Sequence, residues 1–329
     1  MESIIEDIRN RASEKGKTIV FPETDDPRIL QAACHLVTQD ICDVILIGDE
    51  KEVNKKAKEE KVKLPAAIQY HSTAEVTEEM VTHLYNRRKH KEISRYEAEQ
   101  KLSQDSLYFG AALVAVGVAD GCVAGSLATT GEVIRAAIHN IGLREGTDIV
   151  SSTFLMALKD GQVLTYADCG VVPYPDEKEL ADIAIESART HRLLMQEEAT
   201  VAMLSFSTKG SAKHEKTQLV TNALEKVQKK APELQIDGEL QFDAAFVPEV
   251  AKRKAPESNV AGKANTFIFP NLDAGNIAYK ITERLAGASA TGPILQGLAH
   301  PMMDLSRGCS WQDIVNASCV AILFAGQTS

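Results

Sequence analysis

The sequence predicts an α/β protein whose sheet or sheets are mainly parallel. Short apolar runs of strand character alternate with longer segments of helical periodicity along almost the whole chain, which is the pattern of consecutive βα units. A chain of 329 residues favours two domains of this kind over one. No apolar run approaches the roughly 20 residues that span a bilayer, so we expect no membrane partner.

The first elements are the clearest. Residues 18–21 predict a buried strand that Pro22 ends, residues 27–37 predict a helix with apolar spacing, and residues 43–47 predict the next strand. Further strands are expected at 121–124, 149–154, 163–165, 200–206, 266–269 and 293–295. Further helices are expected at 76–88, 108–116, 131–140, 177–192, 216–227, 274–285 and 314–324. In such sheets, ligands bind at the carboxyl ends of the parallel strands.

The polar segment 142–148 is the best candidate for a domain boundary. We expect a first α/β domain over residues 1–143 and a second over residues 144–297. A break near residues 298–301 would return the last helix, and with it residues 298–329, to the first domain.

The charge of the chain limits the classes of ligand. A net charge of −10 argues against a nucleic-acid partner, because phosphate backbones need broad basic surfaces. A small anion could still be bound where individual arginines gather, although the basic run 86–91 alone is typical of a solvated helix face. Six cysteines without a CxxC pair and an acidic N-terminus without a signal-peptide pattern predict a cytoplasmic protein with reduced thiols.

Residues 304–313 are the most informative segment for function. Ser306 and Arg307 lie beside a glycine, and a guanidinium in such a turn matches the oxygens of an anionic acyl or phosphoryl group. Asp313 could then accept a proton. The same segment fits a helix capping box with Ser310 as N-cap and Asp313 at the third helical position. The two interpretations are compatible, since a capped helix start is a rigid mount for a base.

The loop 124–131 is a second candidate. It follows a predicted strand and precedes a predicted helix, and Thr129 and Glu132 fit another capping box. Backbone N–H groups exposed there could hold an anion. Ser126 and Thr130 are therefore predicted to bind substrate, although a simple turn is an equally good interpretation.

Other chemistry is less well supported. The loop 205–211 around Lys209 could contact a ligand or be a simple turn. Cys169 and Cys309 lie near candidate loops, but no histidine partner is evident, so we expect buried, unreactive thiols. The chain has no GxGxxG after a strand, no phosphate-binding GxxxxGK[ST], no HExxH and no metal-like cluster of Cys and His.

Eight stretches, in order along nearly the whole chain, together resemble phosphate acetyltransferases, also called phosphotransacetylases. They are residues 21–23 with Arg28, 88–91, 128–135, 203–211, 238–243, 269–276, 292–297 and 304–313. The resemblance implies two α/β domains with a cleft site between them, similar to the isocitrate and isopropylmalate dehydrogenase architecture, and a homodimer. It implies reversible exchange between acetyl-CoA plus phosphate and acetyl phosphate plus CoA. Because neither Cys169 nor Cys309 has an evident activating base, we expect direct transfer in a ternary complex. No cofactor is implied, CoA and acetyl-CoA being substrates, and activation by a monovalent cation is left open.

The family's functional residues map onto this sequence one by one. Its catalytic Ser-Arg pair falls on Ser306 and Arg307, and its base falls on Asp313. Two anion-binding arginines fall on Arg135 and on Arg88, or on the adjacent Arg87. The sequence departs from the family at Glu92, where glycine is usual, and at Ala299-His300, where a basic-polar pair is frequent.

Three rival functions remain to be separated. A phosphate butyryl- or propionyltransferase would differ only in the acyl group. An NAD(P)-linked decarboxylating dehydrogenase is disfavoured by the missing metal-binding carboxylates and cofactor loop. A non-catalytic CoA-sensing or oligomerisation module is disfavoured by the intact set of Ser306, Arg307 and Asp313.

Overall fold

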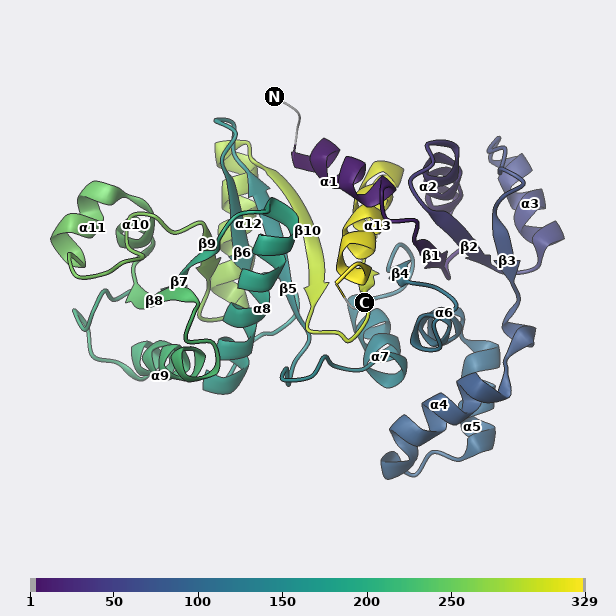
Figure 1. Ribbon diagram of the computed structural model, residues 1–329, viewed down its shortest axis with the longest axis horizontal. Helices are drawn as coiled ribbons and strands as arrows, with labels where there is room; N and C mark the ends of the chain where they lie inside the picture. The colour runs from purple at the N-terminus through teal and green to yellow at the C-terminus, as the bar shows by residue number, and fades with distance from the viewer. Residues whose placement is uncertain (1–3, 328–329) are drawn as a thin grey trace. The chain divides into compact units, whose positions relative to one another are not determined.

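The computed structural model describes residues 4–327 and divides into two compact units (Figure 1). The first comprises Met1–Glu145 with Leu298–Ser329, and the second comprises Gly146–Gly297. Residues 1–3 and 328–329 lie outside the described residues. They are part of the predicted first domain, and residues 1–3 are also part of the acidic N-terminal sequence discussed above. None of the described helices is long and apolar enough to cross a membrane.

The first unit is built on a five-stranded sheet in which every pairing is parallel. Its strands, in spatial order, are β11 (Met302–Asp304), β4 (Gly121–Ala124), β1 (Thr18–Phe21), β2 (Asp43–Ile47) and β3 (Gln69–His71). Because β4 and β11 are parallel neighbours, the loops that follow them leave the same edge of the sheet side by side.

Helices pack on the apolar strands of this sheet. One group comprises α4 (Glu78–Arg88), α5 (Arg95–Gln104), α6 (Ser106–Ala115) and α7 (Thr130–Asn140), whose side chains share a core with alternate strand residues such as Ile45 and Ile47. A second group comprises α1 (Ile4–Ser13), α2 (Pro27–Thr38), α3 (Glu50–Glu59) and α13 (Trp311–Ala325). Figure 1 shows α1 and α13 side by side although they come from opposite ends of the chain.

The second unit contains a six-stranded mixed sheet. Its spatial order is β10 (Ser289–Gln296), β5 (Ser151–Ala157), β6 (Val163–Ala167), β9 (Thr266–Ile268), β7 (Thr200–Leu204) and β8 (Gln235–Leu240). The strands from β6 to β8 pair in parallel, whereas β5 is antiparallel to both of its neighbours. The helices α8 (Glu177–Met195) and α9 (Glu215–Lys230) share one core with this sheet. A second core includes residues of α10 (Phe242–Phe246), α11 (Pro248–Lys254) and α12 (Leu272–Ala286).

The predicted fold class is confirmed, since both sheets are mainly parallel and alternate with helices. The strand predicted at 149–154 runs over Ser151–Ala157, and the one predicted at 293–295 is the end of the longer β10. The sequence missed the three-residue strands β3 and β11, the strand β8 and five helices, namely α1, α3, α5, α10 and α11. The units divide after Glu145 and Gly297, where the sequence predicts divisions after 143 and 297.

Candidate active site

All seven predicted site residues belong to the first unit. Six of them lie in the loop between β4 and α7, in the loop between β11 and α13, or on these two helices. The seventh lies at the end of α4. The loop after β4 and the start of α7 carry Ser126 and Thr130, and Arg135 lies further along α7. The loop after β11 carries Ser306 and Arg307, α13 begins with Asp313 in its first turn, and α4 ends at Arg88.

The loop from β11 to α13 has the predicted helix cap. The Asp313 carboxylate accepts hydrogen bonds from the Ser310 backbone N–H and hydroxyl, both at 2.8 Å. The Ser310 hydroxyl in turn accepts from the Asp313 backbone N–H at 3.2 Å, which completes the capping box. Ser306, Arg307 and Asp313 are all exposed, so the residues predicted to react are open to solvent.

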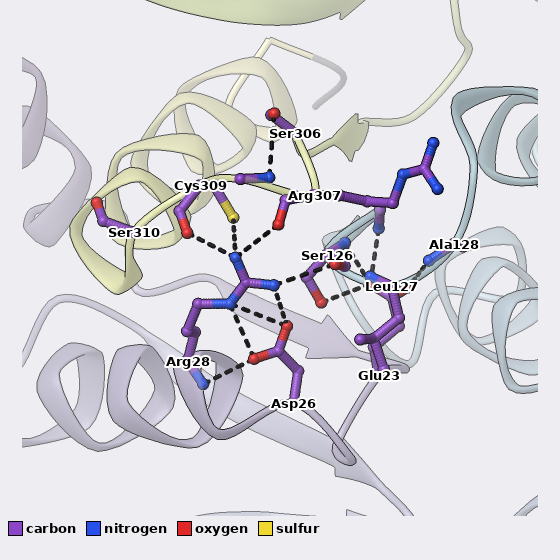
Figure 2. A network of polar contacts seen from close by, with 12 residues as sticks. Glu23, Asp26, Arg28, Ser126, Leu127, Ala128, Ser306, Arg307, Cys309 and Ser310 are labelled. Carbon is purple, nitrogen blue, oxygen red and sulfur yellow. Dashed lines mark hydrogen bonds and ion pairs between the residues drawn. The ribbon is translucent and has the colours of Figure 1, made fainter.

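Arg28 connects this loop to the loop after β4. Figure 2 shows its guanidinium lying between them: Nη1 donates to the carbonyls of Arg307 at 2.9 Å and Cys309 at 2.7 Å, and Nη2 donates to the carbonyl of Ser126 at 3.1 Å. Nη2 also donates to Asp26 at 2.6 Å. Burial works to raise the pKa of Asp26, but the hydrogen bonds from Arg28 outweigh it and hold the pKa below its usual value. Arg28 therefore fixes the backbone around Arg307.

Four backbone N–H groups of the loop after β4 are already bonded within the protein, so they are not available to an anion. The buried Glu23 carboxylate accepts from the N–H groups of Gly125, Ser126, Leu127 and Ala128, at 2.7, 2.8, 3.0 and 2.7 Å (Figure 2). It also accepts from the Ser126 hydroxyl at 3.1 Å. The protein's own carboxylate thus takes four donors of the loop that is predicted to hold an anion.

The two predicted hydroxyl residues both have partners within the protein. Ser126 is buried and bound to Glu23, and the Thr130 hydroxyl donates to Asp304 at 2.6 Å. Burial and the nearby charge of Glu23 raise the pKa of Asp304 to about 6. Substrate binding by Ser126 and Thr130 stays a prediction.

Three arginines in this unit have side chains without hydrogen-bond or ion-pair partners among residues 4–327. They are Arg88, Arg135 and Arg307. Arg87 differs, because its guanidinium donates to the carbonyls of His139 at 3.1 Å and Ile138 at 3.2 Å near the end of α7. Of the tandem pair, Arg88 is therefore the one with donors to offer a ligand.

Arg135 shares one titratable neighbour with Arg88 and another with Arg307. The Tyr108 hydroxyl lies 2.7 Å from His139 Nδ1. Burial, followed by the charges of Arg88 and Arg135, lowers the pKa of His139 to about 4. Hydrogen bonds from Thr129 lower the pKa of Glu132, and the charges of Arg135 and Arg307 add to this effect. The charge of Arg135 thus acts on one neighbour together with Arg88 and on another together with Arg307.

A pocket of about 630 Å³ lies in the first unit, among the start of α6, the end of α5 and the start of α7. Arg135 and Lys101 line it together with Tyr108, Glu132 and Glu23. No group of three His, Cys, Asp or Glu side chains in the described residues is arranged to hold a metal ion.

The thiols and the remaining loop offer less. Burial raises the pKa of Cys309 against the opposing charge of Arg28, and burial raises that of Cys169 well above its ordinary value, which supports the prediction of unreactive thiols. In the second unit, Lys209 pairs with Asp237, so its ammonium group is already neutralised.

Comparisons with known proteins agree on one family. The sequence model of the family described as Phosphate acetyl/butaryl transferase matches residues 3–322. A phosphate acetyltransferase of Acetivibrio thermocellus is 45% identical over 98% of both chains. A solved phosphotransacetylase of Streptococcus pyogenes superposes with a TM-score of 0.93 at 38% identity, covering 98% of both chains. A Salmonella typhimurium protein described as a 4-hydroxythreonine-4-phosphate dehydrogenase is similar in fold alone, with a TM-score of 0.54 at 11% identity over 94% of this chain and 99% of that one.

Proposed function

This chain belongs to the Phosphate acetyl/butaryl transferase family, and we propose that it transfers an acetyl group reversibly between CoA and inorganic phosphate. The observation that carries the proposal is the near full-length identity of 45% with a phosphate acetyltransferase. The site supports it, because CoA, acetyl phosphate and phosphate are all anions and three arginines nearby lack ion-pair partners among residues 4–327.

In the proposed reaction, the CoA sulfur attacks the acetyl carbonyl carbon of acetyl phosphate while Asp313 takes the thiol proton. The carbon–sulfur bond forms, the bond from the carbonyl carbon to the phosphate oxygen breaks, and phosphate leaves with the electron pair. Arg307 neutralises the charge that develops on oxygen, and Ser306 donates a hydrogen bond to the tetrahedral intermediate. The exposure of all three side chains supports these roles.

The thiol is the difficult proton to remove. Ordinary Asp and Cys side chains, near 3.9 and 8.5, differ by about 4.6 pKa units, or roughly 6 kcal/mol against transfer. Cations near the sulfur narrow this gap by stabilising the thiolate. We assign that role to Arg307, and we assign ground-state binding of the anionic parts of the substrates to Arg88 and Arg135. The scheme uses no metal or redox cofactor. Activation by a monovalent cation can be tested by comparing the rates of acetyl transfer in potassium and sodium buffers.

We also propose that the protein is a cytoplasmic homodimer. In the second unit, α12 exposes three large apolar side chains one turn apart, Ile277, Ile281 and Leu285, at 58%, 52% and 83%. Such a stripe supports a contact with a second copy. Light scattering should give twice the chain mass for the wild type and a lower mass for Ile281→Glu. A monomeric wild type would exclude the dimer. Cell fractionation tests whether the protein is cytoplasmic.

The test of the activity is a two-way assay on the purified chain. Acetyl phosphate and CoA should give thioester, and acetyl-CoA and phosphate should release free thiol, without reduction of added NADP. Propionyl and butyryl substrates in the same assay decide the acyl group, which the family description leaves between acetyl and butyryl. If none of these acyl phosphates gave a thioester, the proposal would be contradicted and a non-catalytic CoA-binding role would be favoured.

A further inference from the structure

Asp304 is a buried carboxyl group that the proposed reaction does not use. It ends β11, two residues before Ser306, and is only 2% exposed. Its Oδ2 accepts the hydrogen bond from the Thr130 hydroxyl at 2.6 Å. Within the described chain its Oδ1 has no hydrogen-bond partner, and a Cβ placed on Gly125 would lie 2.4 Å from that atom. The carboxyl group is therefore held closely between two loops.

The two loops are those that carry the candidate site. Leu305, next to Asp304, donates its N–H to the Ala124 carbonyl at 2.8 Å, so the loop after β11 is fixed to the end of β4 at this point. Thr130 is the first residue of α7, the helix that also carries Arg135. The bond from Thr130 to Asp304 therefore connects that helix directly to the strand that precedes Ser306 and Arg307.

Few groups around Asp304 can compensate its charge. From the loop after β1, Glu23 faces it with a second buried carboxylate, 6% exposed, which disfavours ionisation of Asp304. The start of α7 offers the neutral Thr130 hydroxyl, the residues at the end of β4 are the uncharged Ala124 and Gly125, and the Leu305 N–H is bonded to the Ala124 carbonyl. None of the groups that shift the pKa of Asp304 is a cation, so its ionised form depends on hydrogen bonding.

We propose that Asp304 is a positioning residue for the transfer reaction, whose ionised carboxylate holds the first turn of α7, and through it Arg135, in register with the Ser306–Arg307 turn. This inference rests on the proposed function. A hydroxyl bonds more strongly to a carboxylate than to a neutral carboxyl group. Protonating Asp304 therefore loosens the connection, and the pKa of about 6 places that change in weakly acidic solution.

The test compares pH profiles of kcat/KM for Asp304→Asn and two Thr130 variants with the wild type. Asparagine keeps an acceptor oxygen but has no charge to lose. The ratio of Asp304→Asn to wild type should be roughly one tenth at pH 8 and should rise toward one as the pH falls below 6. The phosphate groups of the substrates titrate in the same way in assays of the variant and of the wild type, so their effect cancels in the ratio of the two kcat/KM values. A ratio that stays flat with pH would reduce Asp304 to a structural residue and overturn the proposal.

The threonine variants give the complementary result. Thr130→Val removes the hydroxyl that favours the ionised form, so the acid limb should move to higher pH, whereas Thr130→Ser keeps a hydroxyl and should leave the acid limb at its wild-type pH, whatever it does to substrate binding. An acid limb unchanged in Thr130→Val would contradict the proposal. Asp160→Asn, in an exposed turn of the second unit, is the matched control and should leave the profile unchanged.

A binding measurement separates this inference from the proposed function. CoA affinity, measured by calorimetry on the same variants, should show the same pH-dependent ratio between Asp304→Asn and the wild type, because Arg135 is displaced whether or not turnover occurs. A wild type that binds CoA but transfers no acetyl group would refute the proposed function, and the ratio would still decide the role of Asp304. A flat binding ratio would refute that role.

Discussion

Replacing Glu23 by glutamine should destabilise the first unit severely. The Glu23 carboxylate is buried, and each of its oxygens faces backbone donors: Oε2 faces Gly125 and Ser126, and Oε1 faces Leu127 and Ala128. Glutamine has nearly the same shape, but its NH₂ group cannot accept a hydrogen bond. Whichever way the amide turns, two backbone N–H groups lose their acceptor and face another donor.

The cost follows from those two bonds. A hydrogen bond to a charged partner contributes about 1.5–3 kcal/mol, so losing two costs roughly 3–6 kcal/mol. That is a large part of the 5–15 kcal/mol that stabilises a typical domain. Trp311 is the single tryptophan of the chain and lies at the start of α13 in the first unit, so its fluorescence reports unfolding of this unit in urea.

The urea midpoint of Glu23→Gln should therefore fall far below that of the wild type. The matched control is Glu75→Gln, since the Glu75 carboxylate also accepts a backbone N–H but lies in an exposed capping box, and its midpoint should change little. Equal midpoints for Glu23→Gln and the wild type would show that the N–H groups find other acceptors and that the Glu23 carboxylate does not hold this loop.

Three further predictions concern the reaction. Arg88→Ala should raise KM for CoA or acetyl phosphate, whereas Arg87→Ala should leave both KM values unchanged and lower the thermal midpoint, because the Arg87 guanidinium is bonded to α7 carbonyls; the reverse pattern would exchange their roles. Asp313→Asn should lower the free energy of unfolding by well under about 1 kcal/mol, because the amide oxygen can still accept the capping hydrogen bonds. It should lower kcat by roughly 10²–10⁴-fold, because the amide cannot take the thiol proton. A destabilised variant with preserved kcat would show that Asp313 is only a helix cap. Labelled CoA mixed with acetyl-CoA in the absence of phosphate should show no exchange; exchange that disappeared in Cys169→Ser or Cys309→Ser would mean an acetyl-cysteine intermediate.

The fold could be predicted wherever hydrophobic periodicity is strong. The missed helix α3 buries only Val53 and Ala57, so its sequence has almost no apolar stripe. The missed strand β8 has Asp237 and Gly238 in its middle, two residues that are rare in strands. The strands β3 and β11 have three residues each, too few for a period to be recognised; β9 is as short, but the apolar run Phe267 to Phe269 marks it.

In the candidate site, contacts between residues close in sequence could be predicted, and contacts between distant residues could not. The capping boxes at Ser310 and Thr129 were predicted because their partners lie three residues apart. The roles of Glu23, Arg28 and Asp304 were missed, because they bond to residues between 98 and 281 positions away in the sequence. A buried carboxylate that satisfies a whole loop becomes visible only when the strands are placed beside one another.

In the proposed reaction, Arg307 stabilises charge in the transition state of acetyl transfer. The most direct measurement is kcat for thioester formation from acetyl phosphate and CoA, compared among the wild type, Arg307→Ala and Arg307→Lys. At least about a 100-fold loss of kcat is expected in the alanine variant. Lysine should rescue little, because its single ammonium does not reproduce the forked donors of arginine. A near-normal kcat in Arg307→Ala, with acetyl phosphate and CoA saturating, would contradict the claim.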